Sequence, residues 1–342
     1  MKKRMLITGG AGFIGINAAY FFANKGWDIS IFDNLSRKGA EENLKWLQGA
    51  GVRFEFIRAD IRDKDMVDKA LSGARFDVIL HLAGQVAVTT SVVNPREDFE
   101  INAVGTFNLL ESVRRHSPEA FVIYASTNKV YGKMENARVT ERNGRYEYES
   151  LGNGVSESQI LDFHSPYGCS KGAADQYVLD YARIYGLRTT SFRQSCIYGK
   201  RQFGIEDQGW VAWFTIAAIL DKKITIYGDG KQIRDVLYVD DLLRGYEAAI
   251  EQPERASGQA YNVGGGSRNT LSLLELLEHL KRELNKDIPL KFASWRPGDQ
   301  PVFVCDLSKI KKHLSWEPVV SANEGVRLLI NWVKENKTIF SI

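Results

Sequence analysis

A tyrosine and a lysine stand four residues apart, at Tyr167 and Lys171, within the stretch S-P-Y-G-C-S-K. On a helix this spacing places both side chains on the same face. A phenol ordinarily has a pKa of about 10, so it is a poor base near neutral pH. A neighbouring ammonium stabilises the phenolate and lowers that pKa. The pair therefore predicts removal of a proton from an alcohol, although the same spacing is also common on solvated surface helices.

A second cluster of polar side chains, S-T-N-K-V-Y-G at residues 126–132, follows the apolar run F-V-I-Y. The hydroxyl of Thr127 is placed to share the proton of the same alcohol. Asn128 and Lys129 add an amide and an ammonium. Neither group can replace a carboxylate pair in the acid–base elimination of water. The cluster therefore favours oxidation and reduction of an alcohol without dehydration.

The glycine-rich stretch T-G-G-A-G-F-I-G at residues 8–15 follows a short apolar run and opens a helical pattern. Glycines allow a tight turn and close backbone approach, and a helix N-terminus attracts a pyrophosphate. Asp33, at the end of the next apolar run, can accept hydrogen bonds from a ribose diol, which favours NAD over NADP. Arg37 weakens that preference. The stretch predicts a dinucleotide site, with a packing turn as the alternative.

The elements that must position these residues alternate along the first half of the chain. Apolar runs predict strands at 5–7, 29–32, 54–57, 78–82, 121–124 and 188–192. Helical patterns lie at 14–25, 66–71, 99–115 and 167–185. This alternation predicts a doubly wound α/β fold, with a parallel sheet covered on both faces.

Later segments are less regular. They predict a strand at 224–227, a helix at 271–284 opened by Thr270 or Ser272, and a C-terminal helix near 322–336. We expect a sheet domain over residues 1–193, to which 234–261 returns. A smaller α/β substrate-binding domain is expected over 194–342.

Composition narrows the class of protein. The chain has 342 residues, 44% of them hydrophobic, and a formal net charge of +3. Such a balance predicts no nucleic-acid partner. The three cysteines are far apart and form no metal-binding motif, which indicates free thiols in a reducing cytoplasm and no metal site. No apolar run is long enough to span a membrane, and the N-terminus lacks a signal-peptide pattern. We therefore expect a cytoplasmic protein with no membrane partner.

Taken together, the motifs resemble one family. Their order along the chain is T-G-G-A-G-F-I-G, D-I-R (60–62), H-L-A-G (81–84), N-A-V-G-T-F-N-L-L (102–110), S-T-N-K-V-Y-G, S-P-Y-G-C-S-K, G-D-G-K-Q-I-R-D-V-L-Y-V-D-D (228–241) and R-P-G-D-Q (296–300). Over essentially its whole length the chain resembles the extended short-chain dehydrogenases/reductases that act on nucleotide sugars. The resemblance implies a Rossmann domain that holds NAD and a C-terminal domain that holds a nucleoside diphosphate sugar.

The same resemblance implies roles for individual residues. Thr127, Tyr167 and Lys171 would form the catalytic set. The cofactor-binding residues would be Gly9, Gly12, Phe13, Ile14, Gly15, Asp33, Asn34, Ser36, Arg37, Asp60, Ile61, Leu82, Ala83, Gly84, Asn102, Tyr167 and Lys171. The substrate-binding residues would be Gln85, Ser126, Thr127, Asn128, Arg201, Gln208, Tyr227, Arg234 and Arg296.

Within the substrate set, Arg234 and Arg296 match the family positions for guanidinium groups on the diphosphate. Arg201 is alternatively a solvated loop charge, and Tyr227 a core residue. A purely structural hydrogen bond is the alternative role of the polar residues near the sugar: Gln85, Ser126, Asn128 and His164. Many relatives place an asparagine where Cys196 falls, so the chain departs from the family pattern at the diphosphate.

The resemblance also bears on the reaction. Dehydratases of this family carry Thr-Asp-Glu at the positions of Thr127, Asn128 and Lys129. The chain is most similar to members that invert C2 of a CDP-activated hexose or 6-deoxyhexose through a 2-keto sugar, with NAD as cofactor. The alternatives are a UDP-hexose 4-epimerase and a non-catalytic relative that binds nucleotide or RNA. The implied partners are a nucleotide sugar (a CDP-hexose) and copies of the chain itself, as a homodimer or homotetramer formed through the helices near 99–115 and 167–185.

Overall fold

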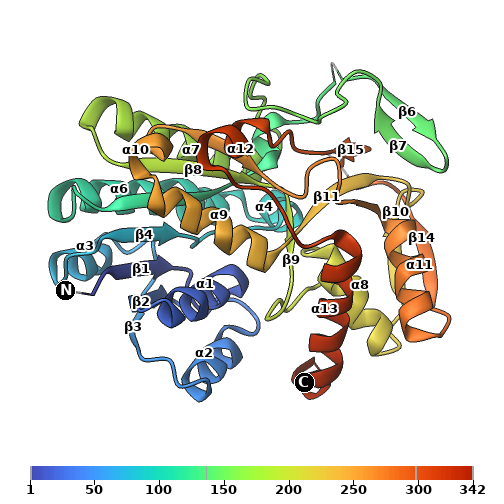
Figure 1. The fold of residues 1–342 in the computed structure, drawn as a ribbon, viewed down its shortest axis with the longest axis horizontal. Coiled ribbons are helices and arrows are strands. Elements are labelled where there is room, and N and C mark those ends of the chain that lie inside the picture. Colours follow the sequence, from blue (N-terminus) through green and yellow to red (C-terminus); the bar gives the residue numbers. More distant parts are fainter. Residues whose placement is uncertain (1, 136, 297–298, 341–342) are drawn as a thin grey trace.

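A parallel sheet forms the centre of the larger unit of the fold (Figure 1). The computed structural model describes residues 2–135, 137–296 and 299–340. The sheet has seven strands in the order β3-β2-β1-β4-β5-β8-β12. Their bounds are β1 (Arg4–Thr8), β2 (Asp28–Asp33), β3 (Phe54–Arg58), β4 (Val78–His81), β5 (Phe121–Thr127), β8 (Thr189–Gln194) and β12 (Ala260–Val263). All neighbouring pairs are parallel.

Helices cover both faces of this sheet because its strands alternate between two apolar clusters. Met5 and Ile7 pack with one group of helices, and Leu6 packs with the other. The first group is α1 (Phe13–Asn24), α2 (Ala40–Gly49), α9 (Val239–Glu251) and α10 (Pro253–Ala256). The second is α3 (Lys64–Ser72), α6 (Gly105–His116) and α7 (Ser165–Tyr185). The predicted doubly wound α/β class is confirmed.

The strand order reverses between β1 and β4. From β1 the chain runs outward through β2 to β3, and it then crosses to β4 on the other side of β1. In doubly wound sheets such a reversal leaves a crevice at the carboxyl ends of the strands, where ligands bind. The glycine-rich turn, Asp33 and Thr127 all lie at these carboxyl ends.

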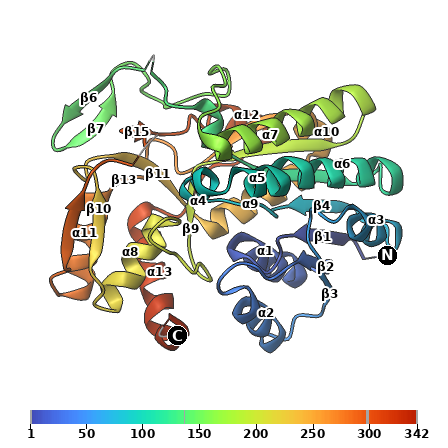
Figure 2. The same cartoon turned by 180° about the vertical axis from the view of Figure 1, so that it is seen from behind.

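A second unit is built on two smaller sheets beside the first (Figures 1 and 2). Its strands are β9 (Cys196–Tyr198), β10 (Ile224–Tyr227), β11 (Ile233–Tyr238), β13 (Thr270–Ser272), β14 (Leu290–Ala293) and β15 (Val302–Phe303). Its helices are α8 (Trp210–Ile219), α11 (Leu273–Leu284) and α13 (Ala322–Glu335). The segment 234–261 divides between the units, since β11 lies in the second unit whereas α9 and β12 pack on the first.

The chain also contains elements with no clear sequence signal. They are α4 (Val88–Val93), η2 (Asn128–Tyr131), the hairpin of β6 (Val139–Arg142) and β7 (Arg145–Tyr148), α12 (Ser308–Leu314) and η3 (Lys337–Phe340). The hairpin is fastened to the second unit by the hydroxyl of Tyr146, which donates to Asp229 Oδ2 at 2.6 Å. None of the helices among the described residues has the length and apolar character needed to cross a bilayer.

Two predicted helices begin differently from the expectation. The helix predicted over 99–115 is three consecutive pieces: α5 (Pro95–Phe99), a π-helical turn η1 (Glu100–Val104) and α6. Of the two candidate caps for α11, Ser272 forms a reciprocal capping box with Glu275, whereas Thr270 lies on β13. A capping box satisfies two backbone donors that the first helical turn would otherwise leave unpaired, and this fixes the helix start at Leu273.

Candidate active site

The glycine-rich turn has no room for side chains. A Cβ added to Gly9 would lie 2.7 Å from the backbone nitrogen of Ala83, and φ at Gly9 is +67°. A Cβ on Gly15 would lie 2.4 Å from the carbonyl oxygen of Gly9. Gly12 is the N-cap of α1 and supplies no side-chain cap, so the first helical N–H groups, including those of Phe13 and Ile14, have no side chain against them. Such a cradle fits the pyrophosphate of a dinucleotide.

Asp33 is held at the end of β2 beside this turn. Its carboxylate accepts hydrogen bonds from the backbone N–H groups of Ala11, at 3.0 Å, and Leu35, at 2.7 Å. Burial raises the pKa of Asp33, and these backbone donors act against that rise. The carboxylate is thereby tied to the glycine-rich turn, beside which the predicted dinucleotide would lie.

The predicted cofactor-binding residues that follow β2 and β3 lie in contact with one another or with α6. Asn34 donates to Asp60 at 2.8 Å, and its side-chain oxygen accepts from the backbone N–H of Ser36 at 3.0 Å. A hydrogen bond from Arg62 lowers the pKa of Asp60 to about 2. The side chain of Ile61 lies against Gly105 of α6, where an added Cβ would be 2.6 Å from Ile61. The structure thus brings this predicted set together.

Leu82, Ala83 and Gly84 form the loop that follows β4. The backbone N–H of Leu82 donates to the carbonyl of Thr8 at 3.0 Å, which joins this loop to the glycine-rich turn. Gly84 lies against Asn102, since an added Cβ would be 3.0 Å from Asn102 Oδ1. The loop therefore lies between the predicted pyrophosphate cradle and the predicted catalytic residues.

Asn102 is a hub of hydrogen bonds in the π-helical turn. Its Oδ1 accepts from the backbone N–H of Gln85 at 2.9 Å, and its Nδ2 donates to Asp98 at 3.2 Å and Ser170 at 3.1 Å. The Ser170 hydroxyl donates to the other oxygen of Asp98 at 2.5 Å. Asn102 therefore fixes the loop after β4 to the start of α7. Ser170 lies within the S-P-Y-G-C-S-K stretch, whereas Asp98 belongs to no motif and only the fold identifies it.

The side chain of Gln85 folds onto its own loop. Its Nε2 donates to the carbonyl of Ala87 at 2.7 Å, and its Oε1 accepts from the backbone N–H of Ala87. Both ends of the amide are therefore engaged in local structure. The structural alternative considered for Gln85 describes this arrangement better than contact with a sugar.

Thr127, Tyr167 and Lys171 converge at the carboxyl end of β5. A hydrogen bond between Thr127 and Tyr167 lowers the pKa of the phenol, but burial dominates and raises it to about 12. Burial lowers the pKa of Lys171 to about 7, against the nearby carboxylates of Asp175 and Asp98. Lys171 Nζ donates to the carbonyl of Ala125 at 2.5 Å. The structure thus brings the three predicted catalytic side chains together, but burial raises the pKa of the Tyr167 phenol instead of lowering it as the neighbouring ammonium predicted.

The other polar residues predicted near the sugar differ in their contacts. The Ser126 side chain is buried near the fully buried Asp175, whose pKa it helps to lower. Asn128 Oδ1 accepts from the Thr127 hydroxyl at 3.3 Å. His164 pairs with Asp162 at 2.8 Å on the exposed approach to α7. Of these, Asn128 is the one in direct contact with the catalytic set.

The two arginines predicted to bind the diphosphate lie in the second unit, and each is paired with a carboxylate. Arg234 Nη2 is 2.6 Å from Asp299 Oδ1, and Arg296 Nη2 is 2.9 Å from Asp207 Oδ1. The Arg296 guanidinium lies 3.9 Å from the centroid of the Tyr227 ring. Positions 297–298 of the R-P-G-D-Q motif lie outside the described residues.

Arg201 and Gln208 both contact residues of the first unit. The Arg201 guanidinium stacks on Trp46 of α2, 4.2 Å from the ring centroid, and it lies 5.7 Å from that of Trp332. Gln208 accepts a hydrogen bond from Arg37, so a predicted substrate residue contacts a predicted cofactor residue. Arg201 therefore joins α2 to α13, and the structure does not group it with Arg234.

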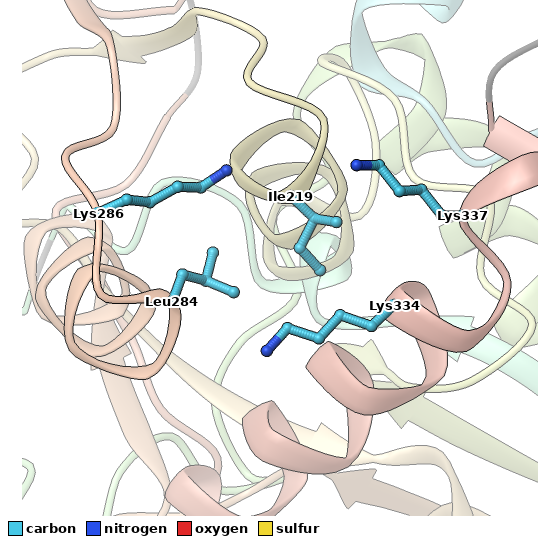
Figure 3. Close-up of a pocket in the computed structure, with 5 residues that line it drawn as sticks. All are labelled: Ile219, Leu284, Lys286, Lys334 and Lys337. Carbon is cyan, nitrogen blue, oxygen red and sulfur yellow. The ribbon is translucent and has the colours of Figure 1, made fainter.

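A separate cavity of about 260 Å³ lies in the second unit, far along the chain from the catalytic residues (Figure 3). It is lined by Ile219, Leu284, Lys286, Lys334 and Lys337. The helices α8, α11 and α13 all end here. Lysines complement the negative ends of helix dipoles, which explains their gathering at this place. Within the described part of the chain, no group of histidine, cysteine and carboxylate side chains could hold a metal ion.

Comparisons with known proteins find relatives over nearly the whole chain. A family model described as GDP-mannose 4,6 dehydratase matches residues 6–329. The chain is 50% identical over 334 residues to the CDP-paratose 2-epimerase of Salmonella typhi, a match that covers 96% of this chain and 98% of that protein.

Solved structures of epimerases also match nearly the whole chain. The UDP-glucose 4-epimerase of Thermotoga maritima, solved with UDP-glucose, is 30% identical with a TM-score of 0.84 and covers 98% of this chain and 99% of its own. The UDP-glucuronic acid 4-epimerase of Bacillus cereus, in complex with UDP-glucuronic acid and NAD, is 28% identical with a TM-score of 0.82 and covers 97% and 99%. Because the family match spans both the glycine-rich turn and the Tyr167–Lys171 pair, this chain belongs to the GDP-mannose 4,6 dehydratase family.

Proposed function

We propose that this chain is an NAD-dependent epimerase that inverts C2 of a CDP-activated hexose. The observation that carries the proposal is the turn after β5, which brings Thr127 to Tyr167 and has no carboxylate at positions 128 and 129. The 50% identity to the CDP-paratose 2-epimerase of Salmonella typhi supports the same reaction. The substrate would be CDP-paratose, converted to CDP-tyvelose, and CDP-glucose would be converted to CDP-mannose by the same chemistry.

In this proposal the chain moves protons at one sugar oxygen. Tyr167, as the phenolate, takes the proton of the C2 hydroxyl, while the Thr127 hydroxyl holds the same oxygen. The Lys171 ammonium stabilises the phenolate. When bound, NAD accepts the C2 hydride and later returns it. After the 2-keto sugar turns over, Tyr167 gives the proton back to the oxygen on the inverted centre.

The chain also has to prevent loss of water from the oxidised sugar. Elimination needs a base at one carbon and an acid at the leaving hydroxyl. Asn128 has no basic or acidic group, and its side-chain oxygen already accepts from Thr127. Lys129 cannot form a carboxylic acid–carboxylate pair with it. These residue types support re-reduction of the keto sugar rather than dehydration.

Division of labour between the two units follows from this proposal. We infer that the seven-stranded unit holds NAD through the glycine-rich turn and Asp33. The second unit would hold the nucleotide diphosphate through Arg234 and Arg296, and Tyr227 would lie near the base. The substrate then spans the crevice between Tyr167 and these arginines.

We also infer that the chain pairs with a second copy through α6 and α7. Large apolar side chains are exposed there: Phe99, Val104, Phe107, Tyr177, Ile184 and Tyr185. The Phe107 and Tyr177 rings pack edge to face, 6.0 Å apart, so the two helices present one continuous apolar surface. An exposed surface of this kind is typical of an interface. A Phe107→Glu, Tyr177→Glu variant that keeps the native mass in multi-angle light scattering would argue against it.

The proposed reaction is tested with purified enzyme and CDP-glucose or CDP-paratose. NMR of the product is expected to show inversion at C2 with no other change in the sugar. Inversion at C4 of a UDP-hexose would assign the chain to the 4-epimerases instead, and loss of water would exclude the mechanism. Tyr167→Phe is expected to lower kcat by at least about 100-fold, because general-base catalysis contributes roughly that much. The Tyr20→Phe variant, which changes a partly exposed phenol of α1 outside the proposed interface, serves as the matched control.

A further inference from the structure

Lys129 occupies a position between the two units. It lies in η2, the 3-10 turn capped by Thr127, whose Oγ1 accepts from the Lys129 backbone N–H at 3.2 Å. The sheet register pairs Thr127 with Gln194, so this turn lies beside the segment that leads from β8 into β9. There β9 pairs with β11, the strand that carries Arg234. The backbone thus places Lys129 next to Thr127 and close to β11, the strand that carries Arg234.

Lys129 differs from Arg234 and Arg296 in its ion pairing. Arg234 is paired with Asp299 at 2.6 Å, and Arg296 with Asp207 at 2.9 Å. Lys129 is half-buried, and among the residues the structure describes it has no carboxylate within ion-pair distance. The charged groups that act on its ammonium are Arg234, which opposes the charge, and Asp299, which favours it. Among Arg234, Arg296 and Lys129, only Lys129 therefore lacks an ion-pair partner in the described part of the chain.

An ammonium in this position is costly without an anionic partner. Removing a charge from water is unfavourable unless it is paired. Burial, and then the charge of Arg234, lower the pKa of Lys129 to about 8. A bound anion would offset both effects. A diphosphate carries two negative charges, and both arginines proposed to hold it, Arg234 and Arg296, are already paired with carboxylates.

We propose that Lys129 binds the diphosphate of the nucleotide-sugar substrate, as the unpaired cation of a site completed by Arg234. This inference rests on the proposed function, because it takes the substrate to be a nucleoside diphosphate sugar held in the same crevice. It assigns the S-T-N-K stretch two tasks. Thr127 serves the reacting alcohol, and Lys129, two residues later, anchors the charged end of the same substrate.

The test compares binding of CDP and of uncharged cytidine to the NAD-loaded enzyme by isothermal titration calorimetry. Lys129→Met is expected to weaken CDP binding by about 10- to 100-fold, the size of one charge-assisted hydrogen bond. Cytidine binding is expected to stay within about twofold, since cytidine has no phosphate. Lys129→Arg is expected to restore most of the CDP affinity. Lys133→Met is the matched control, because Lys133 follows on the same segment but is 47% exposed and faces Glu135 at 3.9 Å. Unchanged CDP binding by Lys129→Met, or an equal loss of CDP and cytidine, would overturn the proposal.

A second measurement needs no variant and applies even if Lys129→Met does not fold. The wild-type chain is acetylated under limiting reagent, and its peptides are quantified by mass spectrometry. CDP is expected to protect Lys129 but not Lys133, and cytidine to protect neither. Equal labelling of Lys129 with and without CDP would contradict the proposal. A wild-type enzyme that fails to convert CDP-hexoses, yet binds CDP through Lys129, would refute the proposed function alone. Normal turnover with an unchanged KM in Lys129→Met would refute this inference alone.

Discussion

The substitution Gly15→Ala tests the pyrophosphate cradle with a single methyl group. The added Cβ would lie 2.4 Å from the carbonyl oxygen of Gly9 and 2.5 Å from the Cα of Gly10. An ordinary contact begins near 3.4 Å, so the start of α1 has to move by about 1 Å relative to the turn. Both atoms belong to the backbone, so no flexible side chain can absorb that movement.

A shift of about 1 Å lengthens a hydrogen bond of about 2.9 Å beyond the range in which it contributes. Each charge-assisted bond from the helix N-terminus to a phosphate is worth about 1.5–3 kcal/mol. Loss of one such bond therefore predicts a decrease in NAD affinity of about 10- to 100-fold. Overpacking adds a loss of folding stability of about 1–3 kcal/mol.

The assay is titration of the apo-protein with NAD, followed by calorimetry, together with denaturant unfolding of the same samples. Gly49→Ala is the control, because Gly49 is the last residue of α2 and an added Cβ there meets nothing within 4 Å. That variant is expected to bind NAD normally and to unfold no more easily than the wild type. NAD affinity within about twofold of wild type for Gly15→Ala would refute the assignment of this turn to the cofactor.

Three further predictions follow from buried charges. Lys171→Met is expected to slow epimerisation at least about tenfold below pH 7, where the wild-type ammonium is present, and progressively less above it, because the pKa of Lys171 is about 7; initial rates from pH 6 to 9 measure this. His81 is held neutral because burial lowers its pKa to about 3. Below a pH of about 6.5, the ordinary pKa of histidine, the unfolded chain therefore binds one more proton than the folded chain, and the free energy of unfolding is expected to fall by about 1.4 kcal/mol per pH unit as the pH drops. In urea unfolding, His81→Gln is expected to remove this contribution to the slope. Arg193→Met leaves Asp175, which is 0% exposed, without its partner at 2.8 Å, and a loss of about 3–5 kcal/mol is expected in denaturant unfolding, with a smaller loss for Arg193→Lys; equal losses would show that the charge is unimportant.

Elements with a strong local signal were predictable. The strands of the first sheet read as apolar runs because both of their faces are covered by helices, as Met5, Leu6 and Ile7 illustrate. The helix predicted at 167–185 is α7 at Ser165–Tyr185. By contrast, the 3-10 turn at Asn128–Tyr131 and the hairpin at 139–148 have no periodicity of their own and depend on contacts with distant segments. The π-helical turn at Glu100–Val104 is likewise invisible to a period of 3.6 residues.

Among site residues, the sequence by itself determined the groups whose chemistry depends on residue type and local spacing. The glycine-rich turn, Asp33, Thr127, Tyr167 and Lys171 belong to this class, and their proximity follows from the rule that parallel strands present their carboxyl ends at one edge.

Only the tertiary structure decided which polar groups are already occupied by partners elsewhere in the chain. It turned Gln85 onto its own loop, placed Arg201 on two tryptophans, and paired Arg234 with Asp299. Among the described residues, it left Lys129 without a carboxylate within ion-pair distance. A side chain's identity is local, whereas its pairing depends on long-range packing, because burial makes every unmatched charge or hydrogen-bonding group unfavourable and so selects the partners.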